Sequence, residues 1–303
     1  MQYLNDIIRR NTRDMLRQNW GKAVALTVTL LAVSLMGALL ESAIGAATGV
    51  YGLSRTLFSA RYPLRELFPW RLLGSLGLTA GIGLLELCLL GPLILGISEW
   101  FFGLSYGYMD GEMGVVFRHF RTPRHFARGV WLAFQTALRS LFYTAVLLLP
   151  GGGLIFLSGL FTRGNPSSLD RIMAIMGMAI GACLLFLGGV TAWILTRRYV
   201  LAPYFIALDD SLSARRALKK SVQTTRGFKT GLAWFQFSFA GWWLLGILVL
   251  PLFYVIPYYW GSTALYARTV MEARRVLRRP GEAAETSVET EVPADGDPAA
   301  DCR

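Results

Sequence analysis

Cysteine and histidine are scarce in this chain of 303 residues. The three cysteines, Cys88, Cys183 and Cys302, are scattered, without a CxxC pair or the even spacing of a disulfide framework. The two histidines, His119 and His125, are six residues apart, which does not match the i, i+4 spacing of metal ligands on one helix face. We therefore expect no disulfide, no metal site and no cofactor, and we interpret both histidines as surface residues.

The motifs of the common enzyme classes are also missing. The chain has no GxSxG, no HExxH, no glycine-rich phosphate loop and no pair of acids beside a histidine. The PGGG run at 150–153 is not a phosphate loop, since no Lys-Ser/Thr follows it and its surroundings are apolar. It weakens a helix and permits a kink or a close helix approach. The sequence thus predicts a protein that is not an enzyme.

Charge is low as well, and long apolar runs are present instead. Only 16% of the residues are charged, whereas 54% are hydrophobic and the mean hydropathy is +0.45. This composition, with apolar runs longer than about 18 residues, is typical of membrane-spanning helices. We predict an all-α fold, a polytopic membrane helical bundle with about six transmembrane helices. The predicted spans are 22–50, 72–100, 140–161, 172–196, 231–250 and 254–269.

The Lys and Arg residues are distributed unequally between the predicted connectors. With six spans and the N-terminus inside, the inner segments and Arg139 hold 23 of the 30 Lys and Arg residues, and the outer connectors hold six. This bias predicts a multi-pass protein of the bacterial inner membrane with both termini in the cytoplasm. One alternative stays open, because the outer connector 51–71 carries four arginines. If residues 72–100 re-entered instead of spanning, that connector would be cytoplasmic.

The formal net charge of +11 does not indicate nucleic-acid binding, because the basic residues lie between apolar spans instead of on one compact domain. The anionic inner leaflet of the bilayer is the expected partner. Residues 280–303 differ from the rest, with seven acids and one arginine among many Pro and Ala residues. We predict one membrane domain over 1–279 and a disordered acidic cytoplasmic tail over 280–303.

Two short segments have the pattern of amphipathic helices at the membrane surface. Residues 1–19 place Leu4, Ile7, Ile8, Met15 and Leu16 among polar and basic residues. The stretch Tyr199–Lys229 contains the second helix, in which about 100° per residue separates two faces. One face holds the small and apolar residues Ala214, Ala217, Leu218, Ser221, Val222 and Thr225. The other holds the basic and polar residues Arg215, Arg216, Lys219, Lys220, Gln223 and Arg226.

The second amphipathic helix also has expected ends and contacts. Asp209, Asp210 and Ser211 supply oxygens to cap its N-terminus, and Gly227 suits its C-terminal end. The small face predicts close packing against other helices. The basic face predicts headgroup contacts with anionic lipid, and the candidate residues are Arg215, Arg216, Lys219 and Lys220.

Two ionisable residues within or next to predicted spans form a candidate intramembrane pair. Glu86 lies near the middle of span 72–100, where an ionised carboxylate is costly, and Arg139 lies at the inner end of the next span. One hypothesis is that they pair or share a wet cavity. The alternative is that Glu86 is an uncharged or isolated acid and that Arg139 extends its guanidinium to the interface.

Several fragments, in order along the chain, resemble one family. They include QNWG at 18–21, LLLPG at 147–151, YVLAPYFIALD at 199–209, ALKKS at 217–221, GFK at 227–229 and FSFAGW at 237–242. Together they resemble the bacterial integral-membrane family labelled domain of unknown function 975, up to about residue 275. The acidic cap followed by ALKKS and GFK is also similar to the membrane domains attached to some glycerophosphodiester phosphodiesterases. The resemblance implies a membrane fold and location, and it implies no catalytic residues. The chain departs from shorter members of the family at segment 152–193, which looks like an extra hairpin.

Three functional hypotheses follow from these observations. The first is a non-enzymatic scaffold, assembly or regulatory protein of the cell membrane, with possible membrane-protein partners. The second is a transporter or permease-like protein for a small or amphiphilic solute, based on Glu86, Arg139 and the glycine-broken spans. The third is a lipid-acting enzyme that uses Asp209 and Asp210, although capping explains both residues directly. The sequence identifies neither a substrate nor an oligomeric state.

Overall fold

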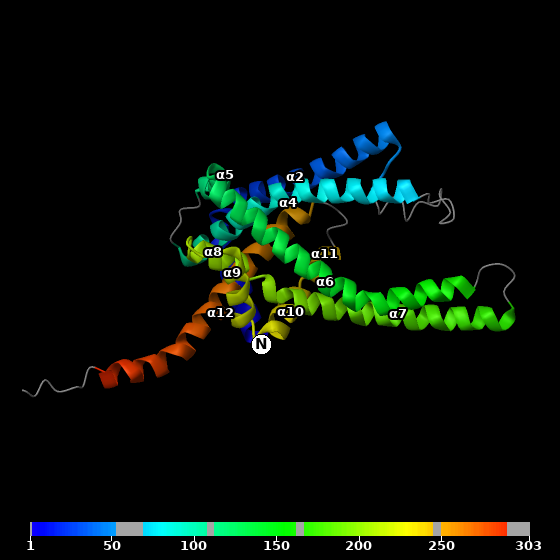
Figure 1. Cartoon of the computed structure of the whole chain (residues 1–303). Helices are drawn as coiled ribbons and strands as arrows, with labels where there is room; N and C mark the ends of the chain where they lie inside the picture. Colours follow the sequence, from blue (N-terminus) through cyan, green and yellow to red (C-terminus); the bar gives the residue numbers. More distant parts are fainter. Residues whose placement is uncertain (1, 53–68, 108–111, 162–166, 245–249, 290–303) are drawn as a thin grey trace, which may run out of the picture.

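The computed structural model describes residues 2–52, 69–107, 112–161, 167–244 and 250–289, and every regular element in these ranges is a helix (Figure 1). The all-α prediction is therefore confirmed. Several predicted features lie outside the described residues, namely three arginines of the first connector (Arg55, Arg61 and Arg65), Cys302 and residues 290–303.

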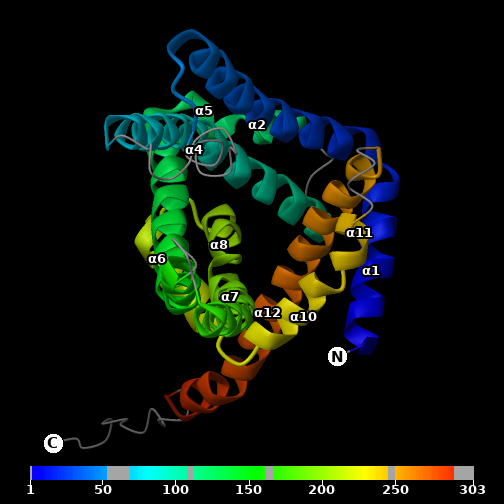
Figure 2. The same ribbon diagram turned by 90° about the vertical axis from the view of Figure 1, so that its right-hand side faces the viewer.

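Two long helical hairpins extend in the same direction from one end of the molecule (Figure 1). The first consists of α2 (Trp20–Thr48) and α4 (Pro69–Tyr106), and the second of α6 (Pro123–Phe161) and α7 (Ser168–Thr196). Figure 2, which faces the hairpin tips, shows α10, α11 and α12 with α1 beside them. Four helical segments of the described residues are long and apolar enough to cross a membrane: Trp20–Thr48, Leu73–Tyr106, Pro123–Phe161 and Ser168–Leu208.

The count of six spans is not confirmed. Span 231–250 is not one helix in the described residues, because α10 (Lys229–Phe237) ends before α11 (Ala240–Leu244) begins. The sixth span corresponds to the start of α12 (Leu252–Glu289), which packs against α4, α1 and α2. Some aromatic residues of these segments, such as Phe235, Phe239 and Tyr258, are buried in the protein, whereas Trp234 and Phe237 are exposed.

Two proline-containing spans are continuous helices. Pro92 lies inside α4 and Pro150 inside α6, and neither ends its helix. The 38 residues of α4 contain no re-entrant turn, which favours the spanning alternative for 72–100.

The helix α12 continues to Glu289, so residues 280–289 of the predicted disordered tail are helical. Alanine and glutamate in this part are good helix formers.

Glycines set the packing of the segment that we call the hairpin arm, residues 140–161 of α6 and 168–196 of α7. A Cβ atom on Gly151 would lie 2.7 Å from the Leu185 nitrogen and 2.8 Å from the Gly181 oxygen, so the two backbones meet there. A Cβ atom on Gly188 would meet the carbonyl oxygen of Leu147. This close approach confirms the prediction for the PGGG run. Large apolar side chains cover the outside of the arm, and Leu149 and Phe186 are each 71% exposed.

The other end of the molecule, which we call the core region, buries many of its large apolar side chains. It comprises α1 (Gln2–Arg17), residues 90–106 of α4, and the helices from α8 to α12. Trp100, Phe101, Phe235 and Phe239 are at most 1% exposed. Their rings contact neighbouring aromatic rings edge-on or stacked, as Phe235 does with Tyr266 at a centroid distance of 5.0 Å.

The N-terminal helix α1 is amphipathic, but its apolar face packs against protein. Ile8 and Leu16 are buried in the core region. The Ser262 hydroxyl of α12 donates to the Thr12 hydroxyl at 3.2 Å, and the Tyr258 hydroxyl donates to the Arg9 carbonyl at 3.2 Å. The apolar face of α1 is therefore covered by α12, and the position of this helix at the membrane surface stays a prediction.

Candidate functional site

A network of ion pairs joins Glu99 and Asp210 of the core region to side chains of residues 118–128. Glu99 of α4 is 6% exposed, and its carboxylate oxygens lie 3.0 Å from Arg118 Nη2 and 2.9 Å from His119 Nε2. Arg118 also pairs with Asp210 Oδ2 at 3.1 Å, and Arg128 of α6 pairs with Asp210 Oδ1 at 3.2 Å. The Arg118 charge and the His119 ring offset the desolvation of Glu99, and the network fixes α5 (Arg118–Arg121) and the turn after α8 (Ala202–Leu208) against α4 and α6.

His119 corrects the prediction that both histidines are surface residues. It is 1% exposed, because α5 turns its ring into the protein toward Glu99, and the ring of His125 lies 6.0 Å away. In the part of the chain that the structure describes, no three His, Cys, Asp or Glu side chains are arranged to hold a metal ion.

The predicted N-terminal cap of the second amphipathic helix is displaced. This helix is α9 (Ala214–Thr224), and its N-cap is Ser213, whose side chain makes no capping hydrogen bond. Asp209 ends α8 instead, and its Oδ1 accepts hydrogen bonds from the Ser211 hydroxyl at 2.6 Å and the Ser211 backbone at 2.9 Å. These hydrogen bonds hold the pKa of Asp209 below its ordinary value. Asp210 takes part in the ion-pair network instead. The turn between α8 and α9 therefore extends beyond the residues that were expected to cap α9.

The two faces of α9 are arranged as predicted. Ala214, Ala217, Leu218, Ser221 and Thr225 are at most 2% exposed. The Ser221 hydroxyl donates to the Arg198 carbonyl at 2.6 Å, which anchors the helix, and Gly227 has a φ of 85° after its C-terminal end.

The basic face of α9 points away from the protein. Its four candidate residues are all exposed: Arg215, Arg216, Lys219 and Lys220. None of them forms an ion pair within the described residues, although Arg215 Nε lies 3.2 Å from the side-chain amide of Gln135. We call these four residues the α9 basic face.

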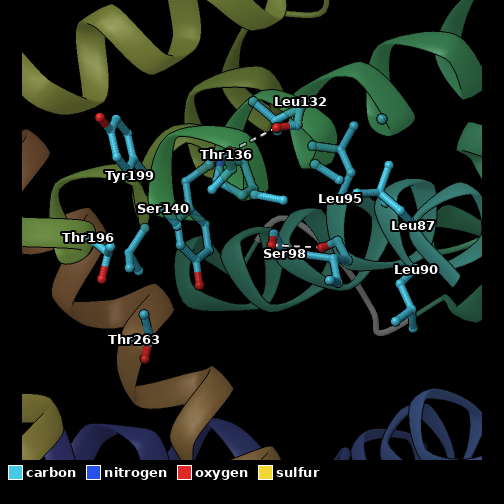
Figure 3. A pocket seen from close by; sticks show the side chains of 18 of the residues that line it. Leu87, Leu90, Leu95, Ser98, Leu132, Thr136, Ser140, Thr196, Tyr199 and Thr263 are labelled. Atoms are coloured by element: carbon cyan, nitrogen blue, oxygen red, sulfur yellow. Dashed lines mark hydrogen bonds between the residues drawn. The ribbon is translucent and has the colours of Figure 1, made fainter. Parts of the chain in front are cut away.

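A cavity of about 550 Å³ lies between α4, α6, α12 and the turn from α7 to α8. Its volume falls in the range of about 300–1,000 Å³ that is common for ligand pockets. Figure 3 shows its two kinds of lining. Leu87, Leu90 and Leu95 lie on one side together with Ser98, and the side chains of Ser140, Thr196, Tyr199 and Thr263 lie on the other.

Glu86 lines this cavity, but it does not pair with Arg139 in the structure. The carboxyl group of Glu86 is half-buried against Gly37 of α2, where a Cβ atom would collide with its Oε1. The guanidinium of Arg139 lies over the ring of Tyr199, 6.0 Å from its centroid. The direct ion pair is therefore absent, because the two side chains point to different neighbours.

Three arginines lie near Tyr199 and Thr196, which line the cavity, although none of the three arginines belongs to its lining. Arg198 Cζ lies 4.3 Å from the ring centroid of Tyr143 and 4.9 Å from that of Tyr199. Arg197 Nη1 donates to Gln236 Oε1 at 2.9 Å, and its Cζ lies 4.8 Å from the ring centroid of Trp193. Within the described residues, no carboxylate pairs with Arg139, Arg197 or Arg198. We call these three residues the arginine cluster.

Sequence reasoning did not find Glu99, and of the arginine cluster it singled out only Arg139. Glu99 is the last acid of an apolar helix, one position before a tryptophan, and this position suits an interfacial carboxylate equally well. The run Arg197-Arg198-Tyr199 offered a usable signal, because arginine beside aromatic residues at a helix end is typical of stacked guanidinium groups.

A comparison with protein families supports the resemblance seen in the sequence. Residues 1–274 match the family described as "Protein of unknown function (DUF975)". The chain belongs to this family. No curated protein and no solved structure matches it. The likeness to the membrane domains of glycerophosphodiester phosphodiesterases stays a prediction.

Proposed function

We propose that this protein is a non-enzymatic integral protein of the bacterial inner membrane that organises or regulates other components at its cytoplasmic surface. In this proposal the hairpins cross the bilayer, both termini are cytoplasmic, and the core region sits at the inner interface. The exposed apolar side chains of the hairpin arm support the first point, since lipid is the solvent that such a surface requires.

The observation that carries the proposal is the α9 basic face, which is held rigidly and has no ion-pair partner within the described residues. Its inner side is packed, and the turn before it is fixed by Asp210. Four cations on a fixed surface attract anionic lipid headgroups or an acidic segment of a partner protein, each contributing about 1 kcal/mol near the membrane.

The test uses the full chain in nanodiscs with and without anionic lipid. A thiol introduced as Gln223→Cys, in a background without the native cysteines, is labelled with a water-soluble maleimide. Anionic lipid is expected to slow labelling about threefold or more at low salt, and the effect is expected to vanish when the α9 basic face is changed to glutamine. The control variant, Arg121→Gln with Arg124→Gln, removes exposed charges from α5 and α6 and should keep the effect.

Labelling that is equally fast with neutral and anionic lipid would contradict headgroup contact. If the wild type and the α9 variant retained the same membrane-protein partners after crosslinking, the organising role of this surface would be excluded as well.

A second candidate function is transport of an amphiphilic solute, and the cavity beside Glu86 favours it. A carboxyl group on the wall of a cavity between long apolar helices is a common feature of solute pathways. The test is flux of a fluorescent amphiphile in proteoliposomes. Glu86→Gln should reduce the flux if the pathway exists, and flux equal to that of empty liposomes would exclude transport of that probe.

A further inference from the structure

We propose that α10 and α11 form a surface that lies in the headgroup region of the inner leaflet, instead of crossing the bilayer as a fifth span. The surface consists of the exposed rings of Trp234, Phe237 and Trp242, and we call it the aromatic face. The inference rests on the proposed position of the hairpins in the bilayer. It adds the surface by which the core region contacts lipid.

The exposed residues of α10 and of the turn after it follow the period of a helix. Thr230, Trp234, Phe237 and Ser238 are exposed, and their spacing of i, i+4, i+7 and i+8 places them on one side. Trp234 is 66% exposed and Phe237 is 56% exposed, whereas Phe235 on the other side is buried in the core region. The helix is therefore fixed to protein on one side and presents two large rings on the other.

The kind of ring distinguishes this face from the hairpin arm. The exposed large side chains of the arm are Leu, Ile, Val, Met and Phe, which suit hydrocarbon. The exposed Trp and Tyr side chains of the described residues all lie outside the arm, and they are Trp131, Trp234, Trp242 and Tyr254. Trp and Tyr combine an apolar ring with one polar group, so they concentrate at the boundary between membrane and water.

Contacts between rings connect the aromatic face to the ends of two spanning helices. The ring of Trp193, in the last turn of α7, lies 6.3 Å from that of Phe237. The ring of Trp20, the first residue of α2, lies 5.0 Å from that of Tyr254, which stacks on Trp242 at 5.9 Å. Seen from the hairpin tips, α10 and α11 lie between α7 and the start of α2 (Figure 2). Both helix ends are at the inner leaflet in the proposed topology, so the face lies at that depth.

The length of α10 and the polar group at its end argue against a crossing by this segment. Its nine residues rise about 14 Å, roughly half of the hydrocarbon thickness of about 30 Å. Just after its end, Arg9 Nη2 of α1 donates to the exposed Ser238 hydroxyl at 2.8 Å. A guanidinium group and an interrupted helix are costly in hydrocarbon, whereas headgroups and water satisfy both.

The experiment measures the depth of the aromatic face in the full chain. In a background without native cysteines, Phe237→Cys is labelled with a fluorophore in detergent, and the protein is reconstituted into nanodiscs that contain phosphatidylglycerol. The lipids carry a nitroxide quencher either at the headgroup or at the end of an acyl chain. The headgroup quencher is expected to act at least about twofold more strongly than the chain-end quencher. Phe186→Cys on the arm is the control and should show the opposite order.

A second set of variants tests whether the indole rings hold this position. The label is moved to Thr230→Cys, on the same side of α10 as Trp234. Trp234→Ala with Trp242→Ala should reduce headgroup quenching of this label about twofold or more, because the interfacial preference of the two rings is lost. Trp131→Ala is the matched control, since Trp131 is exposed but stacks on Phe134 of α6, and it should leave the quenching unchanged.

The outcomes separate this inference from the proposed function. Stronger quenching at position 237 from the chain end would overturn the interfacial position and restore a fifth span. Quenching by neither lipid at 237, with normal quenching at 186, would mean that water, a second copy of the chain or a partner protein covers the face, and would also overturn it. Failure of both quenchers at 186 would instead contradict the proposed function.

The label at Thr230→Cys reads the same depth with both tryptophans present, so the test does not depend on how Phe237→Cys folds. Headgroup quenching at position 230 that is the same with and without the two tryptophans would overturn the role of the rings.

Discussion

The hairpin arm and the core region obtain their packing from opposite kinds of residue. In the arm, Gly151, Gly181 and Gly188 bring two backbones together, and the large apolar side chains face outward. In the core region, Trp100 and Phe235 are buried inward, and ion pairs tie the region to α5 and α6. The difference shows that the two halves are built for different surroundings: burial of apolar area stabilises the core region, whereas close helix contact stabilises the arm.

The strongest test of this contrast removes the central acid of the core region. Glu99→Ala leaves His119 and Arg118 without their carboxylate, and His119 is buried. We expect the free energy of unfolding to fall by about 3 kcal/mol. This value is at the lower end of the range for a broken buried ion pair, because Arg118 is 41% exposed.

Chemical denaturation in detergent, followed by circular dichroism, measures the effect of Glu99→Ala. The matched control is Glu272→Ala, which removes the exposed pair between Arg268 and Glu272 at 2.7 Å. It should cost about 0.5 kcal/mol or less. Equal losses for the two variants would mean that the Glu99 network does not stabilise the core region.

The second test adds a side chain where the arm has none. In Gly188→Leu, the new side chain would collide with the carbonyl of Leu147 and separate α6 from α7. We expect a destabilisation of about 2 kcal/mol, measured by the same denaturation. Gly189→Leu is the control, since nothing lies within 4 Å of a Cβ atom there, and it should be neutral or slightly stabilising. Indistinguishable variants would show that the arm is not held by close glycine packing.

A smaller effect is expected at the turn between α8 and α9. Asp210→Asn removes the charge that pairs with Arg118 and Arg128, and since Asp210 is 47% exposed we expect a loss of about 1 kcal/mol in the free energy of unfolding. Asparagine keeps the hydrogen-bonding shape, so membrane insertion should be unchanged. Loss of a lipid-dependent activity without any loss of stability would instead revive the hypothesis of acid chemistry at Asp210.

The smallest expected effect concerns Asp209 and acid. Hydrogen bonds from Ser211 lower the pKa of Asp209 in the folded state, so this carboxylate contributes stability above its unfolded pKa. This stabilisation should be lost as the pH falls through the pKa that Asp209 has in the folded protein. Hydrogen exchange of the Ser211 amide, compared between pH 7 and pH 3, should show faster opening in acid, and Asp209→Asn should remove that pH dependence. An unchanged wild-type profile would contradict the assignment.

Much of the fold could be predicted from the pattern of apolar residues. The helical period of residues 214–225 correctly separated the buried residues of α9 from the exposed ones. Hydropathy also located the four long spans. The span 231–250 is not confirmed, because α10 ends before α11 begins and hydropathy alone does not show where a helix breaks.

The ion-pair network and the cavity could not be predicted, because both depend on contacts between distant segments. Asp210 lies 82 residues from Arg128 and 92 from Arg118, and no local pattern relates them. Capping is a local rule, so it assigned Asp210 to the nearest helix. Glu86 and Arg139 were paired for their charge and depth, but the direction of each side chain is set by Gly37 and Tyr199 on other helices.

The central claim is that the hairpin arm lies in lipid while α9 faces the cytoplasm, and cysteine accessibility tests it most directly. In a background without native cysteines, Phe186→Cys on the arm and Lys219→Cys on α9 are treated with a charged maleimide in sealed vesicles of known orientation. The account predicts that Lys219→Cys reacts only from the cytoplasmic side and that Phe186→Cys does not react from either side. Rapid reaction of Phe186→Cys, or reaction of Lys219→Cys from the outside, would contradict it.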